Sequence, residues 1–125
     1  MGTRRVNHTA RLLPSGKVLV TGGYTPTSLI SVASSELYDP STGLWTPTAA
    51  MGTARRYHAA VLLPSGSVLV AGGASYNAHF ASSELYEDTG AAPAWRPVVM
   101  GPNLIQPGQS ATVTGTLFRG VSGAS

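Results

Sequence analysis

The chain contains no cysteine. A disulfide framework, a thiolate nucleophile and a cysteine-based metal site are therefore excluded. Charged residues make up only 10% of the 125 residues, and the net charge is +3. Arginine doublets occur only at 4–5 and 55–56, whereas nucleic-acid-binding proteins gather their basic residues on one surface. We therefore expect no nucleic-acid partner.

Long apolar runs and helical patterns are also missing. No stretch approaches the roughly 20 apolar residues that cross a bilayer, so we expect no membrane span. No signal peptide opens the sequence, which leaves the compartment undetermined; a secreted parent protein would carry its signal upstream. Apolar residues do not recur with helical spacing over any useful length, and this favours an all-β chain.

A repeat with a period near fifty residues dominates the sequence. The segment 8–23 returns at 58–73 with twelve of its sixteen residues identical. The pentapeptide Ser-Ser-Glu-Leu-Tyr occurs at 34–38 and again at 82–86, and Trp45 matches Trp95. Self-similarity at such a period indicates a repeat architecture.

Each repeat carries four short strand signals. We expect strands at 8–13, 17–20, 35–38 and 45–47, and at 58–63, 67–70, 83–86 and 95–97. Pro-Ser-Gly at 14–16 and 64–66 predicts a tight hairpin, because proline fixes φ and glycine accepts a positive φ. The second strand is apolar without alternation, which predicts burial on both faces. Proline in the short fourth strand predicts a sheet edge.

The order of these residues resembles a kelch repeat of the bacterial kind, similar to the propeller of galactose oxidase. The shared motif is Arg-x-x-His, then Leu-Pro-x-Gly-x-Val-Leu-Val-x-Gly-Gly, then Glu-Leu-Tyr-Asp-Pro and Trp. It fits at 5–45 and again at 55–95, where Glu-Asp replaces Asp-Pro. The resemblance implies two four-stranded antiparallel blades of an incomplete β-propeller, at 1–52 and 53–102.

Two blades do not close a propeller, because closed rings use about 4–8 blades. Isolated blades would also leave large apolar faces in water, which monomers rarely do. Three explanations stay open: a fragment of a longer protein, a mis-bounded reading frame, or a protomer that closes a ring with its own copies. Either self-association or further blades are then expected as partners. The remaining stretch, 103–125, resembles the truncated start of an immunoglobulin-like domain, with one half-buried strand.

Residues that occur in both repeats are most simply interpreted as scaffold. Buried carboxylates need partners, and Arg5 and Arg55 are the natural candidates for Glu36 and Glu84, either within a blade or across to its neighbour. The matched histidines suggest a shared structural hydrogen bond, and the matched aromatic residues suggest packing between blades. The expected structural residues are Arg5, His8, Gly22, Gly23, Glu36, Tyr38 and Trp45, with Arg55, His58, Gly72, Gly73, Glu84, Tyr86 and Trp95.

The loop after each glycine pair is not repeated. It covers 24–33 in the first repeat and 74–81 in the second, and the two differ in length and content. Loops on a rigid scaffold often carry binding function, although an ordinary polar linker is the alternative. Aromatic and hydrogen-bonding side chains together fit a protein or glycan partner. The candidate ligand-binding residues are Arg56, Tyr57, Tyr76, Asn77, His79 and Phe80.

Enzymes of the galactose oxidase kind use a copper-radical cofactor built from a cysteine cross-linked to a tyrosine, a further tyrosine and two histidines. This chain has no cysteine, so that cofactor cannot be built within it. No phosphate-binding loop, nucleophile elbow or metal-spaced cluster appears. We expect a non-enzymatic binding or scaffold module without a cofactor or metal. The alternative is a piece of a secreted, carbohydrate-active propeller whose catalytic residues lie outside this chain.

Overall fold

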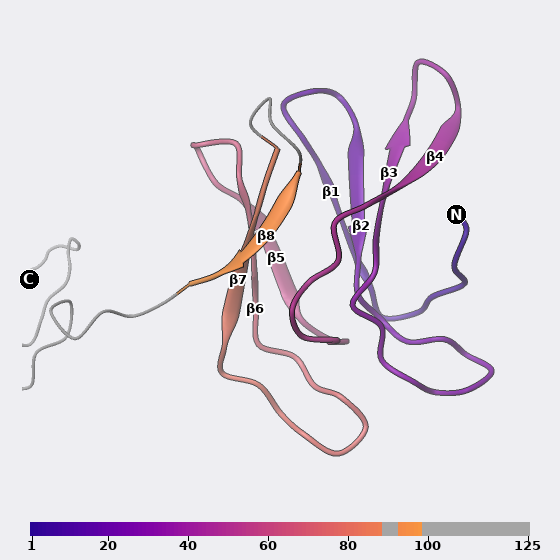
Figure 1. Cartoon of the computed structure of the whole chain (residues 1–125), viewed down its shortest axis with the longest axis vertical. Coiled ribbons are helices and arrows are strands. Elements are labelled where there is room, and N and C mark those ends of the chain that lie inside the picture. Colours follow the sequence, from indigo (N-terminus) through magenta and orange to yellow (C-terminus); the bar gives the residue numbers. More distant parts are fainter. Residues whose placement is uncertain (89–92, 99–125) are drawn as a thin grey trace, which may run out of the picture.

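The computed structural model describes residues 1–88 and 93–98, and this part of the chain contains strands and no helix. The expected tail segment at 103–125 lies outside the described residues. Eight strands form two separate sheets that stand side by side (Figure 1). Their bounds are β1 Thr9–Leu12, β2 Val18–Thr21, β3 Ser35–Asp39, β4 Leu44–Thr48, β5 Ala59–Leu62, β6 Val68–Ala71, β7 Ser83–Glu87 and β8 Ala94–Pro97.

Each sheet is antiparallel and its strands follow chain order, β1-β2-β3-β4 in blade 1 and β5-β6-β7-β8 in blade 2. The predicted all-β fold of two four-stranded antiparallel blades is confirmed. The strand registers of the two sheets correspond, so that Leu19 opposes Leu37 in blade 1 and Leu69 opposes Leu85 in blade 2. The proline-bearing strands β4 and β8 lie at sheet edges, as their sequences predict.

The tight hairpins between the first two strands of each blade form where the Pro-Ser-Gly segments predict them. Gly16 and Gly66 have φ values of 90° and 93°, a region that glycine enters without steric cost. The Leu13 amide donates to the Lys17 carbonyl at 2.8 Å, and the Gly16 amide donates to the Leu13 carbonyl at 2.9 Å. These bonds close the turn and set the register of β1 on β2.

The hydrophobic core lies between the two blades. Blade 1 contributes Leu19 and Leu37 from the face that it turns toward blade 2. Blade 2 contributes Val68, Val70 and Tyr86, which the register places on one face of β6 and β7. Strand β1 lies against β5 at the same contact. Because a sheet buries its apolar face only against another layer, each blade depends on its neighbour.

The glycine pair of blade 1 lies in close contact with blade 2. A methyl group placed on Gly22 would come within 2.5 Å of the His58 ring and 2.6 Å of the Arg55 carbonyl oxygen. The Gly23 amide donates to that same carbonyl at 2.9 Å. The glycine pair therefore lets the two backbones approach closely, and this contact joins the two blades.

Candidate functional site

The repeated polar residues form the same hydrogen-bonded cluster in each blade, which we call the Arg–Glu clamp. In blade 1, Arg5 donates from Nη2 to Glu36 Oε2 at 3.0 Å and from Nη1 to the carbonyl oxygens of Gly22 and Ser34. Glu36 also accepts from the amides of Gly2 at 2.6 Å and Thr3 at 3.1 Å. The clamp therefore ties the segment that enters the blade to β2 and β3.

Blade 2 repeats this arrangement atom for atom. Arg55 donates to Glu84 Oε2 at 3.1 Å and to the carbonyl oxygens of Gly72 and Ser82. The carboxylate of Glu84 also accepts hydrogen bonds from the amides of Gly52 at 2.7 Å and Thr53 at 3.2 Å. Glu36 and Glu84 thus have the arginine partners that buried carboxylates require, each within its own blade.

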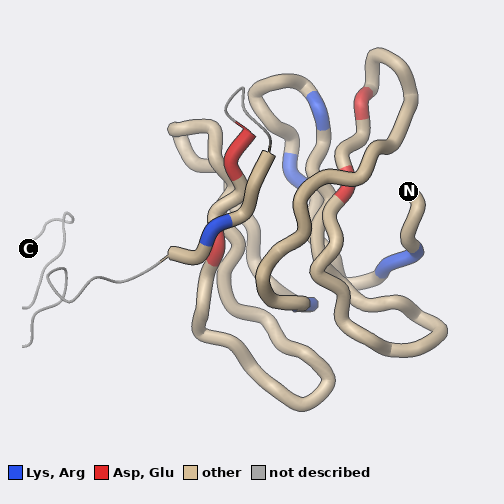
Figure 2. Tube along the Cα trace, in the orientation of Figure 1, with Lys and Arg blue, Asp and Glu red and all other residues tan. Residues whose placement is uncertain are grey.

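Burial and hydrogen bonding act in opposite directions on Glu36. Burial alone raises the pKa of its carboxyl group, but the Gly2 amide, the Arg5 guanidinium and the Thr3 amide outweigh it and hold the pKa below its usual value. The carboxylate is therefore ionised at neutral pH and paired with Arg5. Figure 2 shows how few charged residues the two blades carry.

The two matched histidines differ in their surroundings because only one faces a neighbouring blade within the described residues. His58 lies between the blades, and its Nε2 pairs with the Thr9 hydroxyl at 2.9 Å. His8 makes no such bond with any described residue, so this contact with a hydroxyl is present in blade 2 alone. Burial, and then the Arg55 guanidinium, lower the pKa of His58 to about 4.

We expect the free energy of unfolding to fall as the pH is lowered from about 6.5 to about 4. The unfolded chain takes up a proton on His58 near its ordinary pKa of 6.5, whereas the folded chain does so only near about 4. This part of the stability is complete above the unfolded pKa and is lost through that window, by up to about 3 kcal/mol. Urea unfolding at a series of pH values measures it.

Two variants isolate this effect. In His58→Gln the free energy of unfolding should depend less steeply on pH above pH 4. A smaller dependence should remain from His8, because burial and Arg5 also lower the pKa of His8. His79→Gln, at an exposed histidine, should keep the slope. The loss from Glu36 appears only below its ordinary pKa of 4.5. An unchanged slope in His58→Gln would contradict the assignment.

The repeated aromatic residues pair within each blade. Tyr38 packs on Trp45 with ring centres 5.0 Å apart, and Tyr86 packs on Trp95 at 5.2 Å. The blade 2 pair also contacts blade 1, because the Tyr86 hydroxyl bonds to the Thr48 hydroxyl at 2.8 Å and the Trp95 indole donates to a blade 1 carbonyl. The equivalent pair of blade 1 lies on the face away from blade 2, where no described residue supplies those partners.

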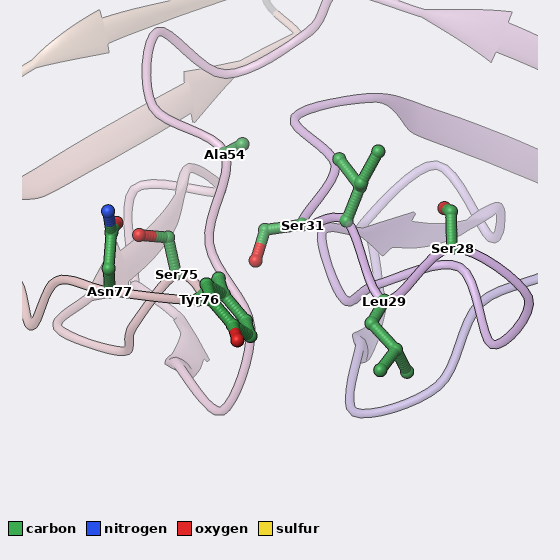
Figure 3. A pocket seen from close by; sticks show the side chains of 8 residues that line it. Ser28, Leu29, Ser31, Ala54, Ser75, Tyr76 and Asn77 are labelled. Carbon is green, nitrogen blue, oxygen red and sulfur yellow. The ribbon is translucent and has the colours of Figure 1, made fainter.

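A pocket of about 590 Å³ lies between the two unrepeated loops (Figure 3). The β2–β3 loop forms one wall and the β6–β7 loop forms the other, and both loops lie at the same end of the two sheets (Figure 1). The lining residues are Ser28, Leu29, Ile30, Ser31, Ala54, Ser75, Tyr76 and Asn77. The pocket therefore exists only because two blades stand next to each other.

The pocket wall combines apolar surface with neutral polar groups. Tyr76 is 81% exposed, so its ring is free to take a contact. Ser31 projects into the space between the loops in Figure 3, and its buried hydroxyl has no hydrogen-bond partner among the described residues. Buried polar atoms are usually paired, so this hydroxyl is an exception.

The structure separates the six predicted ligand-binding residues. Tyr76 and Asn77 line the pocket. Arg56 supports its blade 1 wall, because its guanidinium donates to the Leu29 carbonyl at 3.2 Å and lies 4.8 Å from the centre of the Tyr24 ring. The other three, Tyr57, His79 and Phe80, do not line the pocket.

These three residues have other surroundings. Tyr57 is exposed and has a φ of 58°, and the equivalent Asn7 has a φ of 56°. His79 is exposed within the β6–β7 loop, where it forms an isolated bridge with Ala74. Phe80 lies under the Arg55 guanidinium, 5.5 Å from the ring centre, and so packs against the clamp.

Sequence reasoning missed the blade 1 half of the pocket. Ser28, Leu29, Ile30 and Ser31 have no aromatic or charged signature, and the greater length of the loop at 24–33 was the only available signal. Leu29 adopts a positive φ of 60°, which is uncommon for a leucine and places it at the bend of this loop. Such a backbone state has no mark in the sequence.

Comparison with known proteins does not assign the chain to a family: no protein-family model and no curated protein matches it. Within residues 1–88 and 93–98, no three His, Cys, Asp or Glu side chains are grouped in a way that could hold a metal ion. In the same part of the chain, no helix has the length and apolarity needed to cross a membrane.

Proposed function

We propose that this chain is a pair of kelch-type propeller blades that acts as a non-enzymatic binding module, with a neutral glycan as its ligand. The ligand occupies the pocket between the β2–β3 and β6–β7 loops. The observation that supports this role is the pocket itself, because seven of its eight lining residues come from the two segments that differ between the repeats in sequence and length. Binding sites concentrate in such loops on rigid scaffolds.

The chemistry of the lining favours an uncharged, hydroxyl-rich ligand. All eight lining residues are apolar, hydroxyl-bearing or amide-bearing, and none carries a charge at neutral pH. An exposed tyrosine ring offers its face to the apolar side of a sugar, while hydroxyl and amide groups offer hydrogen bonds to its edge. A charged ligand would lose its hydration in this pocket without gaining a partner of opposite sign.

The lining also supports a role without catalysis. The serine hydroxyls of the pocket have no imidazole or carboxylate among the lining residues to activate them. The histidines at 8 and 58 belong to the blade framework, and His79 does not line the pocket. Binding is therefore the function to test first.

Saturation-transfer NMR with a panel of neutral mono- and oligosaccharides, run beside uncharged peptides, tests the proposal. We expect sugars to receive magnetisation, and we expect Tyr76→Ala to weaken binding by at least about tenfold, or about 1.4 kcal/mol. Tyr57→Asn is the matched control, because it removes another exposed tyrosine that does not line the pocket. Asn already occupies the equivalent position 7 with the same positive φ.

Three results would count against the glycan. Binding of peptides but not sugars would replace it with a protein partner. Equal weakening by Tyr57→Asn and Tyr76→Ala would place the contact outside the pocket. If the folded chain binds neither sugars nor peptides, the proposal is wrong.

A further inference from the structure

The outer face of blade 2 is the repeat equivalent of the face that blade 1 buries against blade 2. Leu19 and Leu37 of blade 1 are buried in that contact, whereas their equivalents Leu69 and Leu85 are only half-buried. Val61, next to Leu69 in the register, is 49% exposed. The outer face of blade 2 is therefore equivalent to the buried face of blade 1, but no described residue covers it.

The outer face of blade 1 is the equivalent of the opposite side of the same contact. Val68 and Tyr86 are buried by blade 1, but their equivalents Val18 and Tyr38 are half-buried. The two outer faces thus correspond to the two halves of one interface that the chain forms internally. The outer face of blade 2 on one copy is therefore complementary to the outer face of blade 1 on another copy.

Among the described residues, the glycine pair of blade 2 also lacks the contacts that the glycine pair of blade 1 makes with its neighbour. Gly22 is packed against the His58 ring, whereas a methyl group on the equivalent Gly72 would meet nothing closer than 3.7 Å. The Gly23 amide bonds across the blades to the Arg55 carbonyl, but the Gly73 amide donates to no described residue. A ring and a carbonyl in the positions of His58 and Arg55 would fill both places.

The outer face of blade 1 carries those groups. His8 and Arg5 are the repeat equivalents of His58 and Arg55. The Asn7 amide also lacks a described partner, whereas its equivalent, the Tyr57 amide, donates to the Asn7 carbonyl at 3.2 Å across the internal contact. The geometry points to a second copy of this chain as the occupant, with His8 of one copy over Gly72 of the next.

We infer that copies of this chain associate head to tail, the outer face of blade 2 on the outer face of blade 1. The contact uses a different surface on each partner, so repeated docking closes into a ring or continues as an open filament. Rings of about 4–8 blades correspond to about two to four copies. This inference is independent of the proposed glycan binding, because neither face includes the loop pocket.

The interface between copies lacks several polar partners of the internal one, among them those at the positions of Arg11 and Thr9. Inside the chain, Arg11 Nε donates to the Ala60 carbonyl at 2.7 Å and Thr9 bonds to His58. Between copies, the equivalents of Arg11 and Thr9 are Val61 and Ala59, which cannot make these bonds. The contact between copies should therefore be apolar and weaker than the contact within each copy.

This difference provides a test with substitutions in opposite directions at one half-exposed residue. Val61→Arg restores the arginine of the internal interface and should lower the dissociation constant by about three- to tenfold, as one recovered hydrogen bond does. Val61→Asp places an unpaired carboxylate in the same contact and should raise it at least about tenfold. Sedimentation velocity of the full chain over the micromolar range measures both, and circular dichroism checks that each variant is folded.

Non-specific charge effects would give the reverse order. The chain has a net charge of +3, so an added arginine increases repulsion between copies and an added aspartate reduces it. Gly72→Ala, which fills the slot expected to receive His8, should also weaken association. Leu44→Asp, at an exposed apolar residue that the register places on the inner face of blade 1 and outside the pocket, should leave it unchanged.

Concentration-dependent mass that responds in this pattern, whether as a ring or a filament, supports the inference. A folded wild-type chain that stays monomeric across the range would overturn it. Association that Val61→Arg and Val61→Asp change in the same direction, or not at all, would also overturn it.

Discussion

Replacing Arg55 with alanine is expected to lower the free energy of unfolding by about 3–5 kcal/mol. The Arg55 side chain is completely buried and makes four hydrogen bonds, one of them to the carboxylate of Glu84. Its removal leaves Glu84 buried with only two backbone amides, and breaking a buried ion pair in this way typically costs about 3–5 kcal/mol. Small domains have total stabilities of only about 5–15 kcal/mol, so this loss is a large share. Far-UV circular dichroism and urea unfolding measure it.

The chain contains a matched control for this change. Arg96 pairs with Glu87 at 2.9 Å, a shorter distance than the 3.1 Å of the buried pair, but the Arg96 side chain is 57% exposed. Exposed ion pairs contribute about 0–1 kcal/mol, so Arg96→Ala should unfold almost like the wild type. Arg55→Lys keeps the charge but not the planar fork, and should fall between the two. Equal unfolding midpoints for Arg55→Ala and Arg96→Ala would refute the importance of the clamp.

The second large effect is expected for Gly22→Ala, with Gly72→Ala as its repeat equivalent. Both glycines have a φ of 70°, which costs an alanine about 1–2 kcal/mol. At Gly22 the added methyl group also meets the His58 ring and the Arg55 carbonyl, and overpacking of this kind adds about 1–3 kcal/mol. At Gly72 the nearest atom is 3.7 Å away, so only the backbone cost applies in the separate chain.

Urea unfolding at a concentration where the chain is monomeric should therefore show a larger loss for Gly22→Ala than for Gly72→Ala. The difference measures the close approach of blade 2, since the backbone conformations are the same. Similar losses for both variants would mean that the contact at Gly22 relaxes without cost.

Much of the fold was predictable because its signals are local. Gly16 and Gly66 mark hairpins through φ values that other residues rarely adopt, and the apolar runs beside them mark the central strands. The repeat then added information that one copy lacks. Arg5 and Arg55 recur with Glu36 and Glu84, and this made the ion pairs recognisable before any geometry was known.

What the sequence could not show depends on which neighbour each residue meets. His8 and His58 occupy the same repeat position, but only His58 has a described blade beside it. Tyr86 is buried while Tyr38 is half-buried for the same reason. The pocket was half predicted: Tyr76 stood out as an aromatic residue in an unrepeated loop, whereas Leu29 and Ile30 became pocket residues only through the packing of two loops.

The Arg–Glu clamp also bears on how a chain of this kind grows in evolution. Every member of the first clamp lies between residues 2 and 36, and every member of the second lies between residues 52 and 84. A gene duplication that begins just before Gly2 or Gly52 therefore copies a complete clamp and severs none. Repeats can be gained or lost as whole units, and only the residues that face the adjoining unit, such as Arg11 and Val61, need to change afterwards.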